Sequence, residues 1–375
     1  MRLAYCFPEA LPSKTARSVQ AVGTCASLAE EVNELILYLP RGKFDGQAIF
    51  QYYGLEKPPN VSVSFLRKSI GPLSSHNLYN RNLSIALKKD RPDIFLSRHL
   101  PTAASLLKKP TPVIYEAHEI FAEKQNASKK DRLRETAVME NVQGTIFISQ
   151  GLQRAMENMY KISGRRKIVP CSARRIPSWA DRHCEHGRID RFVYVGTSRY
   201  PWKGIDTLIE ALSLLPEQCV LEIVGDLDER FCRRPEVMSL MESGRLVIRG
   251  HLPFSEIFLV LKEAQVAVVP NSARDRISAF FTSPLKLVEA LAAGVAVVVS
   301  DLPSMREVVS EKEALFVSPD DPVSLANGIQ KLLQDGSLRN RLAQNGWKRS
   351  CSFSWQNRAR KIVELAQQIL YDSSV

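Results

Sequence analysis

Hydrophobic and polar positions follow a regular order after residue 191. Short runs rich in β-branched residues alternate with segments whose apolar residues recur at helical spacing. In chain order these segments are RFVYVG, GIDTLIEALSLL, VLEIVGD, RLVIRG, SEIFLVLKEA, VAVVP, SPLKLVEALAAG, VAVVVSD and ALFVSP. This order predicts a parallel β-sheet with helices on both faces, whose ligands bind at the carboxyl ends of the strands.

The first half of the chain repeats this pattern less regularly. A helix beginning near Ser18 follows the first strand, and the C-terminus from Asp321 on is mostly helical, with a last helix at 355–371. The predicted strands of this half span residues 3–7, 34–39, 61–65, 93–96, 112–116 and 144–148. We therefore expect an α/β fold with two Rossmann-like, doubly wound domains that face a cleft.

Length supports a division into two domains. A chain of 375 residues that is 45% hydrophobic exceeds what one ordinary core holds, and the segment 168–191 is rich in Pro and Arg and poor in periodicity. We expect a first domain at 1–170, a linker at 171–190, a second domain at 191–354, and a C-terminal helix at 355–375 that crosses back to the first domain.

The chain shows no sign of a membrane span, a leader or a metal centre. It lacks the unbroken apolar run that a span needs, and its N-terminal residues lack the apolar stretch of a signal peptide. The seven cysteines are scattered, without a CxxC pair or a His-Cys cluster, so neither a zinc site nor a disulfide framework is indicated. We expect a cytoplasmic protein.

The positive charge is concentrated in the first half. Residues 1–170 hold 25 Lys and Arg against 15 Asp and Glu, whereas residues 171–375 hold 26 against 25. Such a concentration can attract nucleic acid, an anionic membrane surface or an anionic substrate, and a solvated basic face explains it equally well. The clusters KKDRLR (129–134) and GRRK (164–167) fit phospholipid headgroups or solvated helix ends.

Two cations follow the strand RFVYVG. A glycine turn leads to Arg199 and Lys203, directly before the helix GIDTLIEAL. Cations beside a helix N-terminus form an anion site, because the free backbone N–H groups and the helix dipole add to their charge. A diphosphate would suit this site, although a lone lysine before a helix is common on protein surfaces.

The helix after VAVVP begins with a second set of polar groups. Thr282 and Ser283 stand at the cap position, Pro284 and Lys286 lie in the first turn, and Gly294 lies just past the end. The free N–H groups of this helix would therefore face the cleft.

Glu289 lies one turn into this helix among apolar neighbours, where an unpaired carboxylate is costly. Its partner is expected to be a pair of vicinal hydroxyls, such as those of a ribose, or else a backbone N–H or an arginine.

Two histidines follow predicted strands in the first half. Arg98 and His99 come after DIFLS, and His118 and Glu119 come after VIYEA. Either histidine could orient a hydroxyl or a phosphate oxygen, although a lone histidine is more often structural. His118 is the better candidate, because the neighbouring glutamates are expected to favour its cationic form.

The sequence lacks GxGxxG, Walker A, HExxH and GxSxG motifs, which argues against a dinucleotide dehydrogenase, a P-loop enzyme, a zincin and an α/β-hydrolase. The segments VGTSRYPWKGIDTLIEAL, VAVVP, SPLKLVEALAAGVAVVVSDLPSMREVV and ALFVSPDD instead resemble the retaining glycosyltransferases of family four, which have the GT-B fold of two Rossmann domains. The resemblance spans most of residues 190–325. It extends more weakly to RLAYCFPEALPSKTARSVQ, RPDIFLSRH, VIYEAHEIF and GTIFISQGLQRAM.

The resemblance implies a role for each candidate residue. Lys203 would bind the donor diphosphate and Glu289 the ribose, and His118 would contact the transferred sugar or the acceptor. The implied donor-binding residues are Gly196, Thr197, Lys203, Thr282, Ser283, Pro284, Leu285, Lys286 and Glu289. The implied catalytic residues are His118, Lys203 and Arg199, and the implied acceptor-binding residues are Lys14, Thr15, Arg98, His99, His118 and Glu119.

The sequence departs from the family pattern at three places. Phe281 stands where the family commonly has a first Glu, eight residues before Glu289. Thr197 replaces the usual Arg after the strand-end glycine, with Arg199 close by, and residues 8–18 replace a frequent Gly-Gly loop. The nucleotide site survives these changes better than the sugar site, so the pattern does not identify the donor sugar.

The expected function is transfer of a hexose-type sugar, with retention, from a UDP- or GDP-linked donor to a hydroxyl acceptor. A lipid-linked saccharide in surface polysaccharide or glycolipid synthesis is the first choice of acceptor, with a peripheral location on the inner face of the membrane. A small soluble acceptor is the alternative. No cofactor, metal or nucleic acid is expected. An epimerase, a phosphorylase and an inactive partner subunit of the same fold are the competing interpretations.

Overall fold

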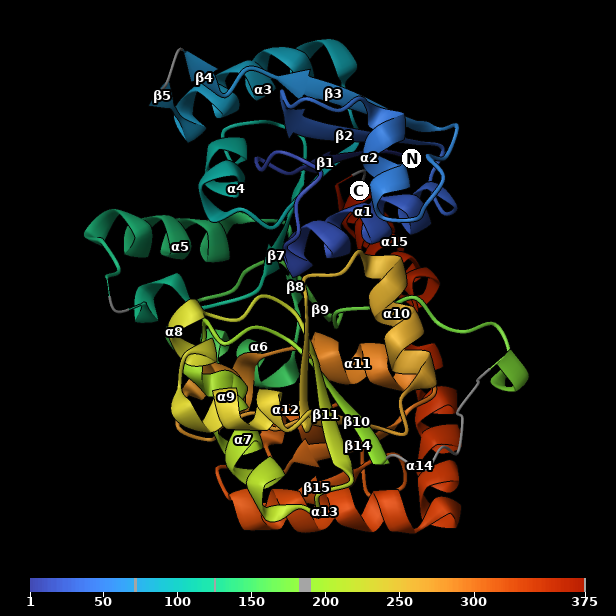
Figure 1. Ribbon diagram of the computed structural model, residues 1–375. Helices are drawn as coiled ribbons and strands as arrows, with labels where there is room; N and C mark the ends of the chain where they lie inside the picture. Colours follow the sequence, from blue (N-terminus) through green and yellow to red (C-terminus); the bar gives the residue numbers. More distant parts are fainter. Residues whose placement is uncertain (71–72, 125, 182–189, 374–375) are drawn as a thin grey trace. The chain divides into compact units, whose positions relative to one another are not determined.

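The computed structural model describes residues 1–70, 73–124, 126–181 and 190–373. Within this range the chain forms two compact units, one made of residues 1–170 and 355–375 and the other of residues 171–354. Each unit is built around its own parallel sheet (Figure 1). None of the described helices combines the length and the apolar character that crossing a membrane requires.

The first unit contains a seven-stranded parallel sheet in the order β3-β2-β1-β6-β7-β8-β9. Its strands are β1 (Arg2–Cys6), β2 (Glu34–Pro40), β3 (Val61–Leu66), β6 (Ile94–Ser97), β7 (Val113–Ala117), β8 (Gly144–Phe147) and β9 (Arg165–Ile168). A short antiparallel pair, β4 (Ser69–Ile70) and β5 (Leu73–Ser74), lies outside this sheet. The six strands predicted for this half are confirmed within two residues at each end.

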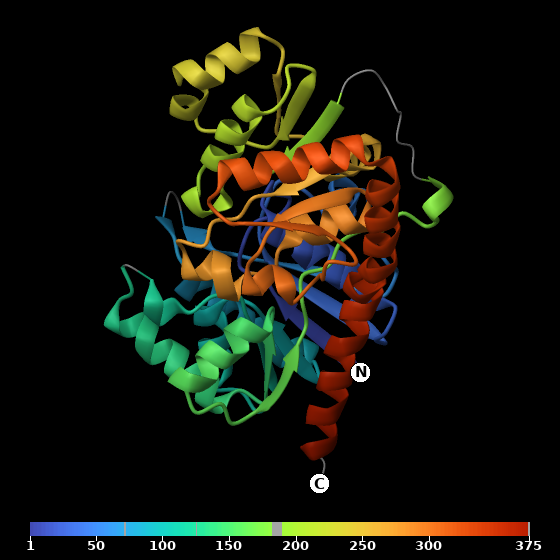
Figure 2. The same ribbon diagram turned by 90° about the horizontal axis from the view of Figure 1, so that it is seen from below.

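The helices of the first unit connect these strands and cover the sheet. They are α1 (Ala16–Ala29), α2 (Gly46–Tyr52), α3 (His76–Asp90), α4 (Leu100–Leu106), the 3-10 turn η1 (Phe121–Glu123), α5 (Lys129–Asn141), α6 (Gln150–Met159) and the last helix α15 (Trp355–Asp372). The helix α15, drawn in dark red in Figure 2, packs against α1, β8 and β9. Gly23 allows the close approach of α1, because a Cβ there would lie 2.6 Å from the ring of Trp355.

The second unit contains a six-stranded parallel sheet in the order β12-β11-β10-β13-β14-β15. Its strands are β10 (Asp190–Val195), β11 (Cys219–Val224), β12 (Leu246–Gly250), β13 (Val266–Val269), β14 (Ala296–Ser300) and β15 (Leu315–Val317). All six correspond to runs predicted from the sequence. The four residues of β13 and the five of β14 are buried throughout, as central strands covered on both faces should be.

The helices of the second unit include three predicted from their periodicity, α7 (Ile205–Leu214), α10 (Phe254–Glu263) and α11 (Leu285–Ala292), and a helical C-terminal part, α13 (Pro322–Gln334) and α14 (Gly336–Arg349). Shorter segments, which the periodicity does not predict, are α8 (Glu229–Cys232), α9 (Pro235–Glu242), α12 (Pro303–Arg306), the π-helix η4 (Ile277–Phe281) and the 3-10 turns η2 (Trp179–Asp181), η3 (Pro201–Lys203) and η5 (Ser350–Phe353).

One basic cluster has a different structure from the expected one. Residues 164–167 are not at a helix end, because Arg165, Arg166 and Lys167 lie in the edge strand β9. Arg165 pairs with Asp372 of α15 at 2.6 Å, so the charge of this strand is partly neutralised within the unit. Charged side chains are a common protection of an exposed sheet edge.

The segment expected to link the domains is described in part. Residues 182–189 lie outside the described residues. The preceding stretch is bonded into the second unit, since Ala173 donates its N–H to Phe353 O and Ile176 donates its N–H to Ala292 O, both at 3.1 Å.

Candidate active site

The strand order of each sheet reverses at one place, where ligands of doubly wound folds bind. In the second unit this place lies between β10 and β13, and in the first between β1 and β6. The loops after β10 and β13 are joined by a hydrogen bond of 2.9 Å from Ser272 N to Trp202 O. The candidate donor residues lie in and after these two loops.

Gly204 sets the shape of the turn that holds Lys203. Its φ is +71°, in the left-handed region, and a Cβ on it would lie 1.7 Å from the carbonyl oxygen of Pro270, at the end of β13. Only glycine fits here without moving the backbone. The backbone directly after Lys203 therefore lies close against the end of β13.

Lys203 lies in an environment with an excess of positive charge. Its Nζ lies 3.8 Å from the ring centroid of Trp202, and Lys286 and Glu289 are close enough to influence its ionisation. Burial and, to a smaller extent, the charge of Lys286 lower the pKa of Lys203, and Glu289 partly opposes both, so that the pKa is about 7. When Lys203 is protonated, two lysines and one glutamate carry a surplus of one positive charge, and an anionic ligand would favour this form and neutralise the surplus.

The start of α11 differs from the expected cap. The N-cap residue is Pro284, without a side-chain hydrogen bond, and the hydroxyl of Ser283 accepts the N–H of Cys171 at 2.8 Å. Thr282 instead ends the π-helix η4, donating its N–H to Ile277 O at 2.9 Å. The prediction that Thr282 and Ser283 cap this helix, with Pro284 inside its first turn, is therefore wrong, because Ser283 is held by a segment distant in sequence.

The uncapped start of α11 remains suited to an anion. Among the described residues, the N–H groups of Leu285, Lys286 and Leu287 have no hydrogen-bond acceptor. Unsatisfied N–H groups at a helix start carry partial positive charge and bind phosphate or carboxylate. Gly294 lies just past the end of α11 with a φ of +73°, as predicted.

Glu289 is 7% exposed, and its partner is Lys286, whose Nζ lies 3.5 Å from Glu289 Oε2. This is a long contact for an ion pair between a buried carboxylate and a partly exposed lysine. The expected alternatives of a backbone N–H or an arginine do not occur among the described contacts of this carboxylate. A pair of ribose hydroxyls remains a prediction.

The other candidate donor residues lie in the loop after β10 and before α11. Gly196 directly follows β10, and the hydroxyl of Thr197 accepts the N–H of Arg199 at 3.2 Å, which fixes the turn. The side chain of Arg199 is exposed, and no described carboxylate pairs with it. Phe281 is 4% exposed and lies with its ring 5.2 Å from the guanidinium of Arg276, so it belongs to the core.

His118 of the first unit belongs to a buried charged network. Its Nε2 lies 2.6 Å from Glu116 Oε1, which also accepts a hydrogen bond from Arg358 Nη2 at 2.5 Å. Arg358 comes from α15 and also donates to Thr24 Oγ1 at 2.9 Å and to Val169 O at 3.0 Å. This network fixes Nε2 of His118 as the protonated nitrogen and leaves Nδ1 as the acceptor.

The expected cationic form of His118 is wrong. Burial and, next, the charge of Arg98 lower its pKa, while Glu116 acts in the opposite direction, and the resulting pKa is about 4. Glu119 does not compensate, because it forms an exposed ion pair with Lys124 at 2.8 Å. His118 is therefore a neutral imidazole near pH 7, since desolvation outweighs a carboxylate already shared with an arginine.

Three of the other acceptor-side residues already have local hydrogen bonds. His99 is the N-cap of α4, and its Nδ1 contacts Thr102 Oγ1 at 2.9 Å. Thr15 is the N-cap residue of α1 and contacts Ser18 Oγ at 3.0 Å, whereas Arg98 donates to Arg17 O at 3.4 Å. Lys14 is exposed. These residues follow β1, β6 and β7, so they lie on the side of the sheet where the strands have their carboxyl ends.

Sequence reasoning missed Arg358 and Trp202, and it took Glu116 only as a neighbour of His118, not as the partner of Arg358. Two signals for this pair were available: Glu116 interrupts the buried strand VIYEA, and Arg358 lies on the apolar face of α15, one turn before Ile362. A charged residue at such a position requires a partner. Trp202 gave no comparable signal.

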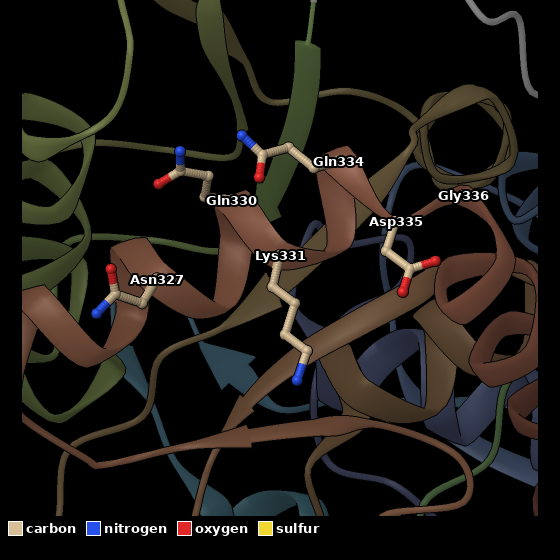
Figure 3. Close-up of a pocket in the computed structure, with 6 residues that line it drawn as sticks. All are labelled: Asn327, Gln330, Lys331, Gln334, Asp335 and Gly336. Atoms are coloured by element: carbon tan, nitrogen blue, oxygen red, sulfur yellow. The ribbon is translucent and has the colours of Figure 1, made fainter.

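A hollow lies along α13 and is lined by Asn327, Gln330, Lys331, Gln334, Asp335 and Gly336 (Figure 3). None of these residues belongs to the cluster around Lys203. Within the described residues no group of three or more His, Cys, Asp or Glu side chains is arranged to hold a metal ion.

Known proteins match this chain in sequence. Residues 189–335 match the family model described as Glycosyl transferases group 1. The serotype-specific mannosyltransferase WbdA of Escherichia coli is 25% identical over 261 residues, which cover 68% of this chain and 30% of WbdA. The phosphatidyl-myo-inositol mannosyltransferase of Mycobacterium tuberculosis is 26% identical over 257 residues, which cover 60% of this chain and 64% of that protein. The chain thus spans less than a third of WbdA.

Solved structures match nearly the whole chain. Sucrose-phosphate synthase from Thermosynechococcus elongatus has a TM-score of 0.75 at 17% identity, covering 99% of both chains. The Anabaena protein HepE, solved in complex with UDP and glucose, has a TM-score of 0.71 at 16% identity, covering 97% of this chain and 98% of its own. Residues 189–335 are therefore similar to the group 1 glycosyltransferases, and the chain as a whole has the GT-B fold.

Proposed function

We propose that this protein transfers a hexose-type sugar from a nucleoside-diphosphate sugar to a hydroxyl acceptor, with retention at the anomeric carbon. The observation that carries the proposal is the surplus positive charge of Lys203 and Lys286 around Glu289, beside the uncapped start of α11. Such a site suits a diphosphate next to a ribose. The UDP and UDP-glucose complexes of HepE, a structural neighbour, support the same ligand class.

The barrier of this reaction comes from separating positive charge on the sugar from negative charge on the departing diphosphate. Lys203, Arg199 and the N–H groups at the start of α11 would stabilise the leaving group with charges already in place, which is usually the largest catalytic contribution. Deprotonated Lys203 would regain its proton as the diphosphate binds, because an adjacent anion favours the ammonium form.

The bond changes need no protein nucleophile. The bond from the anomeric carbon to the diphosphate oxygen breaks, and a bond to the acceptor oxygen forms on the same face of the sugar. The acceptor's proton passes to the leaving phosphate, so the products are a glycoside and a nucleoside diphosphate. We propose that the nucleotide sugar is a co-substrate and that no separate cofactor takes part.

His118 would orient a hydroxyl in this reaction. Because its Nε2 is directed to Glu116 and its pKa is lowered to about 4, the neutral ring can accept a hydrogen bond at Nδ1. A hydroxyl of the transferred sugar or of the acceptor is the fitting donor. Glu116 and Arg358 act as positioning residues, since they hold the ring and its tautomer.

The proposed acceptor is a saccharide, in the first place a lipid-linked one in cell-surface polysaccharide or glycolipid synthesis. The names of the two mannosyltransferase relatives support this class, one being serotype-specific and the other acting on phosphatidyl-myo-inositol. A small soluble hydroxyl compound is the alternative acceptor.

A panel of UDP- and GDP-linked sugars, offered with and without candidate acceptors, tests the proposal. Mass spectrometry should detect a nucleoside diphosphate and a glycosylated product, and NMR of the product should show the anomeric configuration of the donor. Binding of no nucleoside diphosphate in a thermal-shift screen would contradict the proposal and favour an inactive partner subunit.

A further inference from the structure

A hollow of about 560 Å³ lies between α4 and α5 in the first unit, two neighbouring helices that contact each other (Figure 1). Its floor is apolar and its rim is basic. It is lined by Ala104 of α4, by Leu107 directly after α4, and by Lys129, Lys130, Leu133, Arg134 and Ala137 of α5. None of them belongs to the candidate acceptor or donor residues.

The outer face of α5 combines apolar and cationic side chains. Lys129, Leu133 and Ala137 follow one another at intervals of one helical turn, with Lys130 and Arg134 in the adjacent row. The opposite face holds the buried residues of this helix, which include Val138. Leu133 is 62% exposed, which is unfavourable in water unless another surface covers it.

The charges on this face are positive and mostly unpaired. No carboxylate among the described residues pairs with Lys129 or Lys130, and Arg134 has one contact of 3.5 Å to Asp131. Glu135 is fully buried and accepts the N–H groups at the start of η1, so it does not neutralise the face.

Further cations lie beside the hollow, because Lys108 and Lys109 directly follow Leu107. An exposed leucine surrounded by cations matches the interface of an anionic bilayer, where apolar groups enter the boundary region and ammonium groups meet phosphates. Nucleic acid would match the charge, but it would leave Leu107 and Leu133 uncovered, and no aromatic side chain lines the hollow for base stacking.

We propose that the hollow between α4 and α5 docks the protein on an anionic phospholipid surface. Leu107 and Leu133 enter the interface, and Lys129, Lys130 and Arg134 bind lipid phosphates around them. The inference concerns the placement of the first unit at a membrane and is independent of the donor chemistry. It identifies the surface responsible for the membrane attraction that the charge of residues 1–170 suggested only in general.

The test uses co-sedimentation of the full chain with vesicles of phosphatidylcholine, with or without phosphatidylglycerol. The α5 variant K129E/K130E/L133S should bind anionic vesicles at least about 30-fold more weakly, because each cation near a charged bilayer contributes substantially to binding. The binding of the unchanged protein should weaken as salt is added, since the attraction is screened.

Helix α3 offers a matched control. Ile85 is also 62% exposed, and Lys88 and Lys89 lie in the last turn of the same helix, but none of the three lines the hollow between α4 and α5. The control variant I85S/K88E/K89E has the same change of net charge and should keep binding within about threefold, because the proposal gives these residues no contact with the lipid phosphates. The melting temperature and far-UV circular dichroism of each variant confirm folding, and K129Q/K130Q replaces the triple variant if that one does not fold.

Unchanged binding of the α5 variant would overturn the proposal, as would equal loss in both variants, which would indicate unspecific charge attraction. Equally strong binding of the unchanged protein to neutral vesicles, or stronger binding to single-stranded RNA, would also overturn it. Nucleotide-sugar turnover with a soluble acceptor should be the same in the α5 variant and the unchanged protein, so failure here is distinguishable from failure of the proposed transferase activity.

Discussion

The Lys203 cluster and the His118 network differ in whether their buried charges are balanced by other residues of the protein. Around Lys203, two lysines share one glutamate, and the N–H groups that start α11 have no described acceptor. Around His118, Glu116 lies between Arg358 and the imidazole, so the charges balance within the unit. The first arrangement would be balanced by an anionic ligand, whereas in the second the charges of Glu116 and Arg358 already balance each other and the ring is neutral. The proposed chemistry divides in the same way between leaving-group stabilisation and orientation.

The charge balance of the His118 network depends on Arg358. Replacing Arg358 with Met would leave Glu116 buried without its cation and should destabilise the first unit by about 3–5 kcal/mol. Urea unfolding followed by circular dichroism measures this. Arg360 on the same helix, with an exposed side chain, is the control, and its replacement should cost about 0–1 kcal/mol. Equal effects of the two replacements would show that the network contributes nothing special.

The positive charge of the Lys203 cluster can be reduced by replacing Lys203. Lys203→Ala should lower kcat by roughly 10²–10³, because a preorganised charge on the leaving group is lost. Lys312 is exposed in the same unit, so Lys312→Ala is the control and should leave turnover unchanged. The readout is steady-state release of nucleoside diphosphate. A Lys203→Ala variant with the turnover of the unchanged protein would remove Lys203 from the mechanism.

Replacing Ser283 should affect the stability of the second unit and its nucleotide affinity differently. Ser283→Ala removes the acceptor of the buried Cys171 N–H and should destabilise the second unit by about 1–3 kcal/mol. Nucleotide affinity should change little, because the hydroxyl does not cap α11. Thermal denaturation and calorimetric titration with UDP or GDP check both parts. A large loss of affinity with unchanged stability would restore the predicted capping role.

Much of this organisation could be predicted from the sequence, because it depends on local patterns. Alternating β-branched and helical segments predict both sheets, and a glutamate among apolar residues points to Glu289. The rest depends on contacts between distant residues. Cys171 lies 112 positions from Ser283, and Arg358 lies 242 positions from Glu116. Neither the altered start of α11 nor the network around His118 could therefore be predicted from neighbouring residues. The pKa of His118 was mispredicted for the same reason, since burial and Arg98 outweigh its neighbours in sequence.

The central claim is that the charge surplus at Lys203 receives a diphosphate, and the pH dependence of binding tests it most directly. Free Lys203 has its pKa lowered to about 7, and a bound anion should raise it again. Between about pH 7.5 and 9.5, binding should therefore take up a proton and weaken with rising pH, at most by about tenfold per unit. Titration calorimetry with UDP or GDP in buffers of different ionisation enthalpy measures this uptake.

The control for this measurement is Lys203→Arg, which stays protonated over the whole range and should bind without proton uptake. The account predicts uptake approaching one proton in the unchanged protein and none in the arginine variant. Affinity that stays constant from about pH 7.5 to 9.5 without proton uptake would contradict it.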